Sequence, residues 1–295
     1  MATPRQIRSR IRVAKNIQQI TKAMKMVAAA RLRRAQEAVA AARPYAEKMR
    51  DVLESLESGG AGGGVQHPLL RRGEGEPRTI GVIMVTGDRG LCGAYNSSII
   101  RRTMELVRPF GPERVKLVCI GKKGATFFRR RGYEIVAEHP VPATGIAFSD
   151  AQSLSRTARD LFEQGEIDAL YLVYTQFVSA MTQRPQTVPL LPIQPTQTDA
   201  AAPASPSGPQ ADYIFEPSPE EILGSLLPRY VDTQVFQAVI ESIASEHGAR
   251  MTSMSSATDN AGKMISGLTL SLNRARQAAI TKEIAEIVGG AEALK

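Results

Sequence analysis

The sequence predicts a mixed fold (α+β/α/β), in which the N- and C-terminal helices form a long antiparallel coiled coil and an α/β domain is attached to its side. Three observations support this prediction. Apolar residues alternate at spacings of three and four at both ends of the chain, the middle carries short continuous apolar runs, and stretches rich in Gly or Pro separate these parts. Aromatic residues make up only 5% of the 295 residues, which also favours a helical protein.

Residues 3–57 are predicted to form one helix about 80 Å long. Its apolar stripe begins with Val13, Ile17, Ile20, Met24 and Val27. After a shift of one residue, the stripe continues with Ala28, Leu32, Ala35, Val39, Ala42, Ala46, Met49, Leu53 and Leu56. A kink is expected at Pro44, and the glycines of residues 59–64 should end the helix.

A second long helix is predicted from Pro219, with Ser218 as its N-cap, to the glycine pair at 289 and 290. Its apolar stripe consists of Met251, Met254, Thr258, Ala261, Ile265, Leu268, Leu272, Ala275 and Ala279. Neither helix can bury its stripe alone, so residues 1–58 and 214–295 are expected to pair as an antiparallel shaft.

The middle of the chain, residues 78–193, is predicted to form a Rossmann-like α/β domain. Continuous apolar runs at 79–85, 115–120 and 167–174 indicate strands covered on both faces. Helical segments are expected near 95–108, 122–131 and 149–165, which gives a mainly parallel sheet. Residues 59–77 and 194–213 are expected to be flexible connections.

The net charge of +8 is concentrated at the N-terminus. Residues 1–36 contain ten basic residues and no acidic one, and residues 1–58 carry the whole excess. Residues 216–295 carry a charge of −3, so the C-terminal helix is expected to complement part of the N-terminal charge. The remainder should face an acidic partner.

The sequence contains little that points to catalysis, to a cofactor or to a metal. Its histidines, His67, His139 and His247, have no nucleophile or carboxylate at a recognisable spacing. Cys92 and Cys119 have no metal-ligand spacing. We therefore expect no catalytic residue, no cofactor and no metal.

A glycine-rich loop at residues 86–96 follows the first predicted strand and could bind phosphate. However, the G-x-x-x-x-G-K-[ST] pattern is absent, and a tight strand-to-helix connection is the preferred interpretation. A nucleotide-binding enzyme and a nucleic-acid-binding coiled coil stay open as alternatives.

Several motifs resemble, in the same order, those of the gamma subunit of F-type ATP synthase, and the resemblance covers nearly the whole chain. They are ITKAMKMVAA at 20–29, DRGLCG at 88–93, YIFEP at 213–217, ATDNAG at 257–262, NRARQAAITKEI at 273–284 and EIVGGA at 286–291. The resemblance implies a central-stalk rotor that couples proton-driven rotation of the c-ring to ATP synthesis at the beta-subunit sites. Such a subunit transmits torque and performs no bond chemistry itself.

The resemblance also implies which residues meet partners. Contacts with the beta subunit or coupling are expected at Met24, Lys25, Glu246, Arg250, Arg276, Gln277, Thr281 and Glu283. A bearing inside the hexamer is expected at Ile284, Ile287, Val288 and Leu294, and a foot on the c-ring and the epsilon subunit at Tyr213 and Glu216.

The implied partners are the alpha and beta subunits, with one copy of this chain per three alpha–beta pairs, the epsilon subunit and the c-ring, and no nucleic acid. The expected location is the cytoplasmic face of a bacterial cell membrane, as a peripheral protein.

Overall fold

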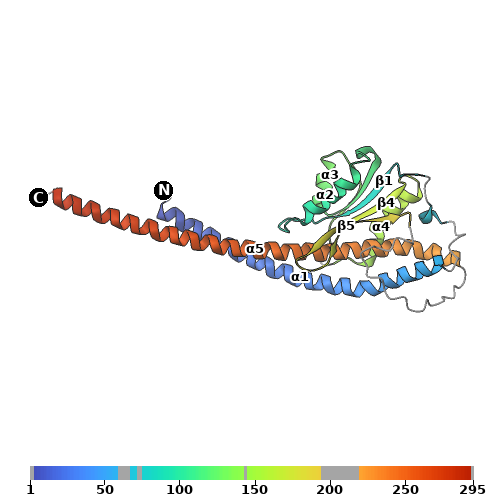
Figure 1. Cartoon of the computed structure of the whole chain (residues 1–295), viewed down its shortest axis with the longest axis horizontal. Helices are drawn as coiled ribbons and strands as arrows, with labels where there is room; N and C mark the ends of the chain where they lie inside the picture. The colour runs from blue at the N-terminus through green and yellow to red at the C-terminus, as the bar shows by residue number, and fades with distance from the viewer. Residues whose placement is uncertain (1–2, 59–66, 72–74, 143–144, 194–218, 294–295) are drawn as a thin grey trace. The chain divides into compact units, whose positions relative to one another are not determined.

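The computed structural model describes residues 3–58, 67–71, 75–142, 145–193 and 219–293 (Figure 1). The chain divides into two compact units, one formed by Met1–Ala29 with Arg250–Lys295 and the other by Ala30–Ala249. Two long helices, α1 (Pro4–Ser58) and α5 (Pro219–Ala293), contribute to both units.

Both predicted long helices are confirmed, with one difference in detail. Helix α1 includes Pro44, and the kink expected there stays a prediction. Helix α5 continues through Gly289 and Gly290 to Ala293, so the predicted stop at this glycine pair is wrong. Glycine has no side chain that opposes the helical conformation, and its cost of about 1 kcal/mol does not by itself end a helix.

The second unit contains a five-stranded sheet in the order β3-β2-β1-β4-β5. The strands β1 (Ile80–Val85), β2 (Val115–Ile120), β3 (Glu134–His139) and β4 (Ala169–Phe177) run parallel to one another. The last strand, β5 (Gln183–Leu191), pairs antiparallel with β4. The prediction of a mainly parallel sheet is therefore confirmed.

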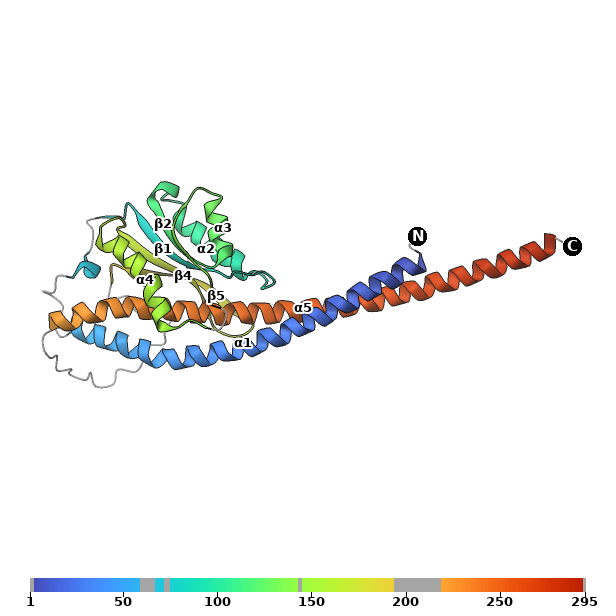
Figure 2. The same ribbon diagram turned by 180° about the vertical axis from the view of Figure 1, so that it is seen from behind.

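Helices cover the sheet on both faces. Figures 1 and 2 show α2 (Tyr95–Val107) and α3 (Lys122–Arg129) on one side of the sheet, and α4 (Phe148–Glu163) together with α5 on the other. Successive side chains of β1 point alternately toward these two layers of helices. Ile80, Val82 and Met84 belong to a core that also contains Ile99 of α2 and Phe128 of α3.

Two strands were not predicted from the sequence. Strand β3 alternates exposed and partly buried residues, and β5 contains Pro185 and Pro189. Both lie at the edges of the sheet, where one side of the strand has no neighbouring strand. Only strands that are buried on both faces give the continuous apolar runs by which a strand can be recognised in the sequence.

The predicted connections lie mostly outside the described residues, but residues 67–71 and 75–77 of the first connection are described. Pro68–Leu70 forms a 3₁₀ turn, and Leu69 is fully buried. The backbone N–H of Ile193 donates a hydrogen bond to the carbonyl of Leu69 at 2.9 Å. This part of residues 59–77 is therefore attached to the end of the α/β domain.

Candidate functional site

The first unit is an antiparallel pair formed by the N-terminal part of α1 and the C-terminal part of α5. The Thr258 hydroxyl donates a hydrogen bond to the Thr21 hydroxyl at 2.8 Å, and Lys25 Nζ donates to the Ser255 hydroxyl at 3.0 Å. Residue numbers on one helix rise as those on the other fall, which confirms the predicted antiparallel coiled coil in this unit.

The residues of α1 that face the helix pair differ from those predicted for its first half. Ile7, Ala14, Thr21, Ala28 and Ala35 are buried and are spaced by seven residues. Leu32, Ala46, Met49 and Leu53 are also buried, as predicted. The seam thus continues along α1 without the predicted shift of one residue.

The stronger apolar stripe in the first half of α1 is left open to solvent. We call Val13, Ile17, Ile20 and Val27 the exposed stripe of α1, with exposed fractions of 55%, 49%, 59% and 54%. Their prediction as seam residues is wrong. Small residues in the seam allow the helices to approach closely enough for the contact between Thr21 and Thr258, which larger β-branched residues would prevent.

The stripe predicted on α5 is confirmed through most of its length. Met254 and Ala261 are buried, and Thr258, Ile265, Leu268, Leu272 and Ala275 are partly buried. Beyond residue 275, every side chain of α5 described up to residue 290 is exposed. The last turns of α5 therefore form a single helix within this unit.

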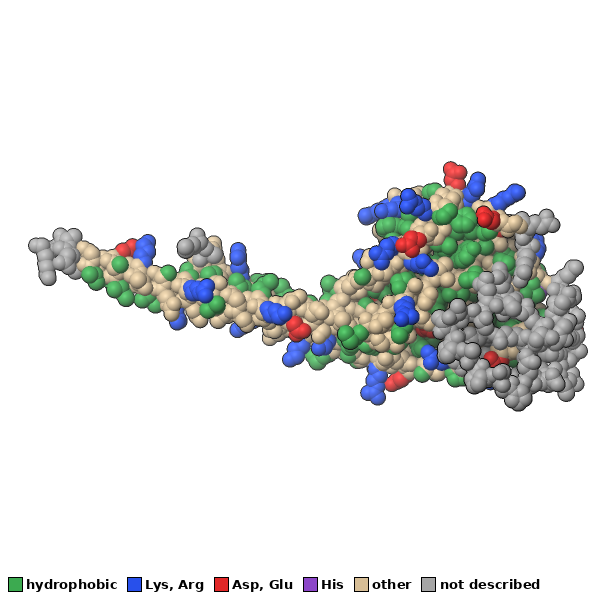
Figure 3. Space-filling model, in the orientation of Figure 1, with side chains coloured by type: hydrophobic (Ala, Val, Ile, Leu, Met, Phe, Trp, Pro, Cys, Tyr) green, Lys and Arg blue, Asp and Glu red, His purple; other side chains and the backbone are tan. Residues whose placement is uncertain are grey.

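The basic residues of α1 also face solvent. All ten basic side chains in residues 1–36 are exposed, and among the described residues only Arg33 of this group makes an ion pair, with Glu37 at 3.3 Å. Lys and Arg side chains project singly along the paired helices, with hydrophobic side chains between them (Figure 3).

The C-terminal helix does not supply the expected complement in this unit. Residues 250–295 contain six basic and four acidic residues, because most of the acidic residues counted from 216 onward precede position 250. The prediction that α5 neutralises part of the N-terminal charge is therefore wrong for the residues that pair with it, and the basic charge of α1 is available to other molecules.

The predicted contact residues lie in different surroundings. Met24 and Arg250 are partly buried, whereas Lys25, Arg276, Gln277, Thr281 and Glu283 are exposed. Ile284, Ile287 and Val288 are exposed on the single-helix end of α5. Tyr213, Glu216 and Leu294 lie outside the described residues.

Glu246 differs from the other predicted contact residues. It is 7% exposed, and its carboxylate lies against Gly87, where an added Cβ would come within 2.9 Å of Glu246 Cδ. The second unit thus already covers most of this side chain. A contact of Glu246 with another subunit stays a prediction.

In the second unit, α5 lies where a doubly wound fold would bind a ligand. The order of the strands reverses between β1 and β4, and ligands of such sheets bind outside the carboxyl ends of these strands. Here the Ser242 hydroxyl accepts a hydrogen bond from Thr175 N at 3.2 Å, and Ser245 Oγ donates to the Thr175 carbonyl at 3.1 Å. With Glu246 beside Gly87, α5 thus contacts the chain near the carboxyl ends of both strands.

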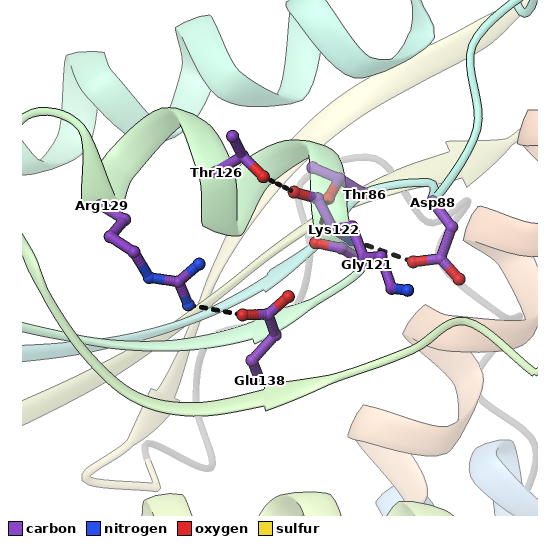
Figure 4. A network of polar contacts seen from close by, with 7 residues as sticks. All are labelled: Thr86, Asp88, Gly121, Lys122, Thr126, Arg129 and Glu138. Atoms are coloured by element: carbon purple, nitrogen blue, oxygen red, sulfur yellow. Dashed lines mark hydrogen bonds and ion pairs between the residues drawn. The ribbon is translucent and has the colours of Figure 1, made fainter.

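The glycine-rich loop after β1 forms a tight connection held by its own side chains. Asp88 Oδ1 accepts a hydrogen bond from Lys122 N, the first amide of α3, at 2.9 Å (Figure 4). Asp88 Oδ2 accepts from Val141 N at 3.2 Å, and the Thr86 hydroxyl accepts from Gly124 N at 3.0 Å. A carboxylate of the chain thus occupies the position at the start of α3 where a phosphate could bind.

The histidines and cysteines have structural surroundings. His67 Nδ1 accepts a hydrogen bond from Leu69 N at 3.1 Å, and burial lowers the pKa of His67 although Glu163 acts in the opposite direction. Burial, with a smaller contribution from Glu138, raises the pKa of Cys119 to about 12. In the described part of the chain, no group of three or more His, Cys, Asp or Glu residues could hold a metal ion.

These features define the chain as a helical shaft protein whose α/β domain is closed by its own helix. The sequence pattern of the family described as ATP synthase matches residues 3–294. ATP synthase gamma chains of Desulforamulus reducens and Heliobacterium modesticaldum are each 52% identical, the first over the full length of both chains and the second over 98% of both. The chain therefore belongs to the family of ATP synthase gamma chains.

Solved structures share the fold. A chain of the central stalk and c-ring of Tetrahymena thermophila mitochondrial ATP synthase is 22% identical, with a TM-score of 0.59 over 81% of this chain and 99% of that one. A chain of the Euglena gracilis mitochondrial enzyme is 17% identical, with a TM-score of 0.66 over 99% of this chain and 94% of that one.

Proposed function

We propose that the chain is the central-stalk rotor subunit of an F-type proton-translocating ATP synthase. In this role it couples rotation of the c-ring, driven by proton flow, to ATP synthesis at the beta-subunit sites. The observation that carries the proposal is the antiparallel helix pair, whose contact between Thr21 and Thr258 leaves an apolar stripe and ten basic side chains exposed.

A role in transmitting torque, with no bond chemistry, agrees with the second unit. Side chains of α5 contact the chain near the carboxyl ends of β1 and β4, and the start of α3 is capped by Asp88. These contacts use the chain's own residues at the two positions where an α/β domain of this topology would bind a nucleotide. They favour a rotor over a nucleotide-binding enzyme.

The contact residues expected from the resemblance fit a rotor that turns within a ring of alpha and beta subunits. Lys25 is exposed on α1, and Arg276, Gln277, Thr281 and Glu283 are exposed near the end of α5. Exposed ion pairs contribute only about 0–1 kcal/mol each. Contacts of this strength would hold the rotor at each of three equivalent positions without trapping it there.

The single-helix end of α5 supports the proposed bearing. Ile284, Ile287 and Val288 each expose more than half of their surface, on a part of α5 whose side chains are all exposed from residue 276 to residue 290. Apolar side chains exposed close together commonly mark an interaction site. A closed ring of other subunits around this end would remove them from water.

We also propose the partners and the location that follow from this role. They are the alpha, beta and epsilon subunits and the c-ring, and the chain would reach the cytoplasmic face of the bacterial membrane through the c-ring. Among the described helices, none combines the length and the apolar character that a membrane crossing requires. Attachment through other subunits agrees with that finding.

Co-expression with alpha and beta subunits tests the proposal. We expect a stable complex with one copy of this chain per three alpha–beta pairs, measured by native mass spectrometry. Membranes that lack their own gamma subunit should regain ATP-driven proton pumping when this chain is supplied. Tight binding of ATP or NAD by the isolated chain, or steeply salt-dependent binding of DNA without assembly, would instead favour one of the two alternatives.

A further inference from the structure

Within the second unit, α5 is covered on all sides over three turns, by the α/β domain and by α1. Residues 238–248 are buried without interruption, and a helix has 3.6 residues per turn, so every face of α5 is covered there. The buried residues include Glu241, Ser242, Ser245 and His247, whereas a helix packed by apolar contacts alone would bury mainly aliphatic side chains. The polar side chains indicate that specific hydrogen bonds fix α5 in this position.

One polar attachment joins α5 to α4. The carboxylate of Asp232, whose side chain is 4% exposed, lies 3.3 Å from Arg159 Nη2. The Ser155 hydroxyl donates a hydrogen bond to the same carboxylate oxygen. Gln152 Nε2 of α4 donates a hydrogen bond to the other oxygen, Asp232 Oδ2, at 3.5 Å. We call these contacts of Asp232 with Gln152, Ser155 and Arg159 the Asp232 attachment.

Asp232 is also the partner that balances the buried charge of Arg159. Its side chain is 15% exposed, and Asp232 is its only ion-pair partner among the residues that the structure describes. Its Nε atom is buried and has no hydrogen-bond partner there. Two charges that are buried in this way are stable only in a fixed geometry, because each loses its hydration and depends on the other.

A second polar attachment joins α5 to the end of β4. Ser242 and Ser245 bond to the backbone N–H and carbonyl of Thr175, and Glu241 Oε2 accepts a hydrogen bond from Phe177 N at 3.4 Å. Ten residues separate Asp232 from Ser242, which corresponds to about 15 Å along α5. A single attachment would leave a pivot, whereas two that are separated along the axis oppose both rotation and sliding of the helix.

We propose that Asp232 is a positioning residue of the rotor, through which α4 fixes the α/β domain on α5 so that torque passes between them. The inference rests on the proposed rotor function. It adds to that function the position on α5 at which torque is transmitted between the helix and the α/β domain. The second attachment, made by Glu241, Ser242 and Ser245 at the end of β4, shares the load. Loss of Asp232 therefore makes the connection more compliant and does not detach the domain.

The test uses the full chain assembled with alpha and beta subunits and carrying Asp232→Leu together with Arg159→Met. Replacing a buried pair by apolar residues of similar volume commonly preserves stability, so the variant should fold and assemble. A probe attached to the α/β domain reports its angular fluctuations while the alpha–beta ring is held in one nucleotide state. One of the two polar attachments is lost, while apolar contacts such as that between Phe148 of α4 and Phe236 of α5 remain. We therefore expect the angular variance to rise, by up to about twofold.

The matched control replaces a pair that lies within the α/β domain and does not reach α5. Arg129 and Glu138 form such a pair, and Arg129→Gln with Glu138→Gln should leave the angular variance unchanged. If the double apolar variant does not fold, Ser155→Ala removes one bond of the attachment, keeps both charges and should raise the variance by a smaller amount.

The outcomes separate the two proposals. A complex that assembles and melts like the wild type, but whose angular variance does not rise, overturns the role of Asp232 and leaves the rotor function intact. A wild-type chain that does not assemble with alpha and beta subunits rejects the rotor function and this inference together. An equal rise in the control variant would show a general loosening of the domain and would also overturn the inference.

Discussion

The exposed stripe of α1 gives the sharpest prediction about assembly. We consider a variant with Val13, Ile17, Ile20 and Val27 all replaced by Gln. Complete burial of such a side chain contributes about 1.5–3 kcal/mol. Each side chain exposes roughly half of its surface, so a partner can gain about half of this value at each position, or about 3–6 kcal/mol in total.

The free chain should tolerate these replacements. Gln has a higher helix propensity than Val or Ile, and surface substitutions usually change the free energy of unfolding by about 0.5 kcal/mol or less. The affinity of the variant for the alpha–beta ring should fall at least about a hundredfold, since 1.4 kcal/mol corresponds to a factor of ten. Titration of labelled full-length chain into the alpha–beta ring measures this affinity, and circular dichroism measures the helix content.

A control on a neighbouring face of α1 makes the result specific. Asn16, Ala23 and Ala30 are exposed, and their replacement by Gln should leave the affinity unchanged. An affinity of the stripe variant within about threefold of the wild type would refute the reasoning, because it would show that these side chains stay in water in the assembly.

Three further predictions concern the second unit and coupling. Gly121→Ala should lower the free energy of unfolding by about 4 kcal/mol in urea titrations, because φ is +96° and a Cβ would lie 2.1 Å from the Thr86 carbonyl oxygen. Gly111→Ala, with φ at +76° and no atom within 4 Å, should cost only about 1 kcal/mol, and equal losses would contradict the role of close packing. The lowered pKa of His67 means that the fold favours its neutral ring. Its contribution to stability should be complete above pH 6.5 and be lost as the pH falls through the lowered value, so unfolding of His67→Asn should depend less on pH between about 7.5 and 5. Met24→Lys should impair ATP-driven proton pumping more than assembly, and unchanged pumping would reject a coupling role for this partly buried residue.

Much of the fold could be predicted because its main elements are either very long or buried on both faces. The runs that form β1, β2 and β4 are apolar almost throughout, since helices cover both sides of the sheet. The edge strands β3 and β5 lack this signal, because β3 alternates in burial and β5 contains two prolines. Their existence depends on pairing with β2 and β4, which no local pattern reveals.

The candidate site was less predictable, because the most apolar stripe was not the one used for pairing. The seam residues Ala14, Thr21 and Ala28 are small or polar, and a search for hydrophobicity ranks them below Val13 and Ile17. The signal that could have found them is their constant spacing of seven, which continues to Ala35 and Met49 without a shift. The burial of Glu246 against Gly87 could not be seen in the sequence, because the two residues are far apart in the chain.

The use of small residues in the seam has a consequence for the proposed rotor. If Ile17 and Ile20 faced α5, the pair would be held by its strongest apolar residues and would present a mainly charged surface. Because Thr21 and Ala28 fill the seam instead, the exposed surface combines aliphatic side chains with basic ones that form no ion pair with the described side chains of α5. Aliphatic contacts have no preferred direction and screened charges act over about 10 Å. A surface of this kind can meet three equivalent partners in turn, whereas directional hydrogen bonds would favour one of the three positions.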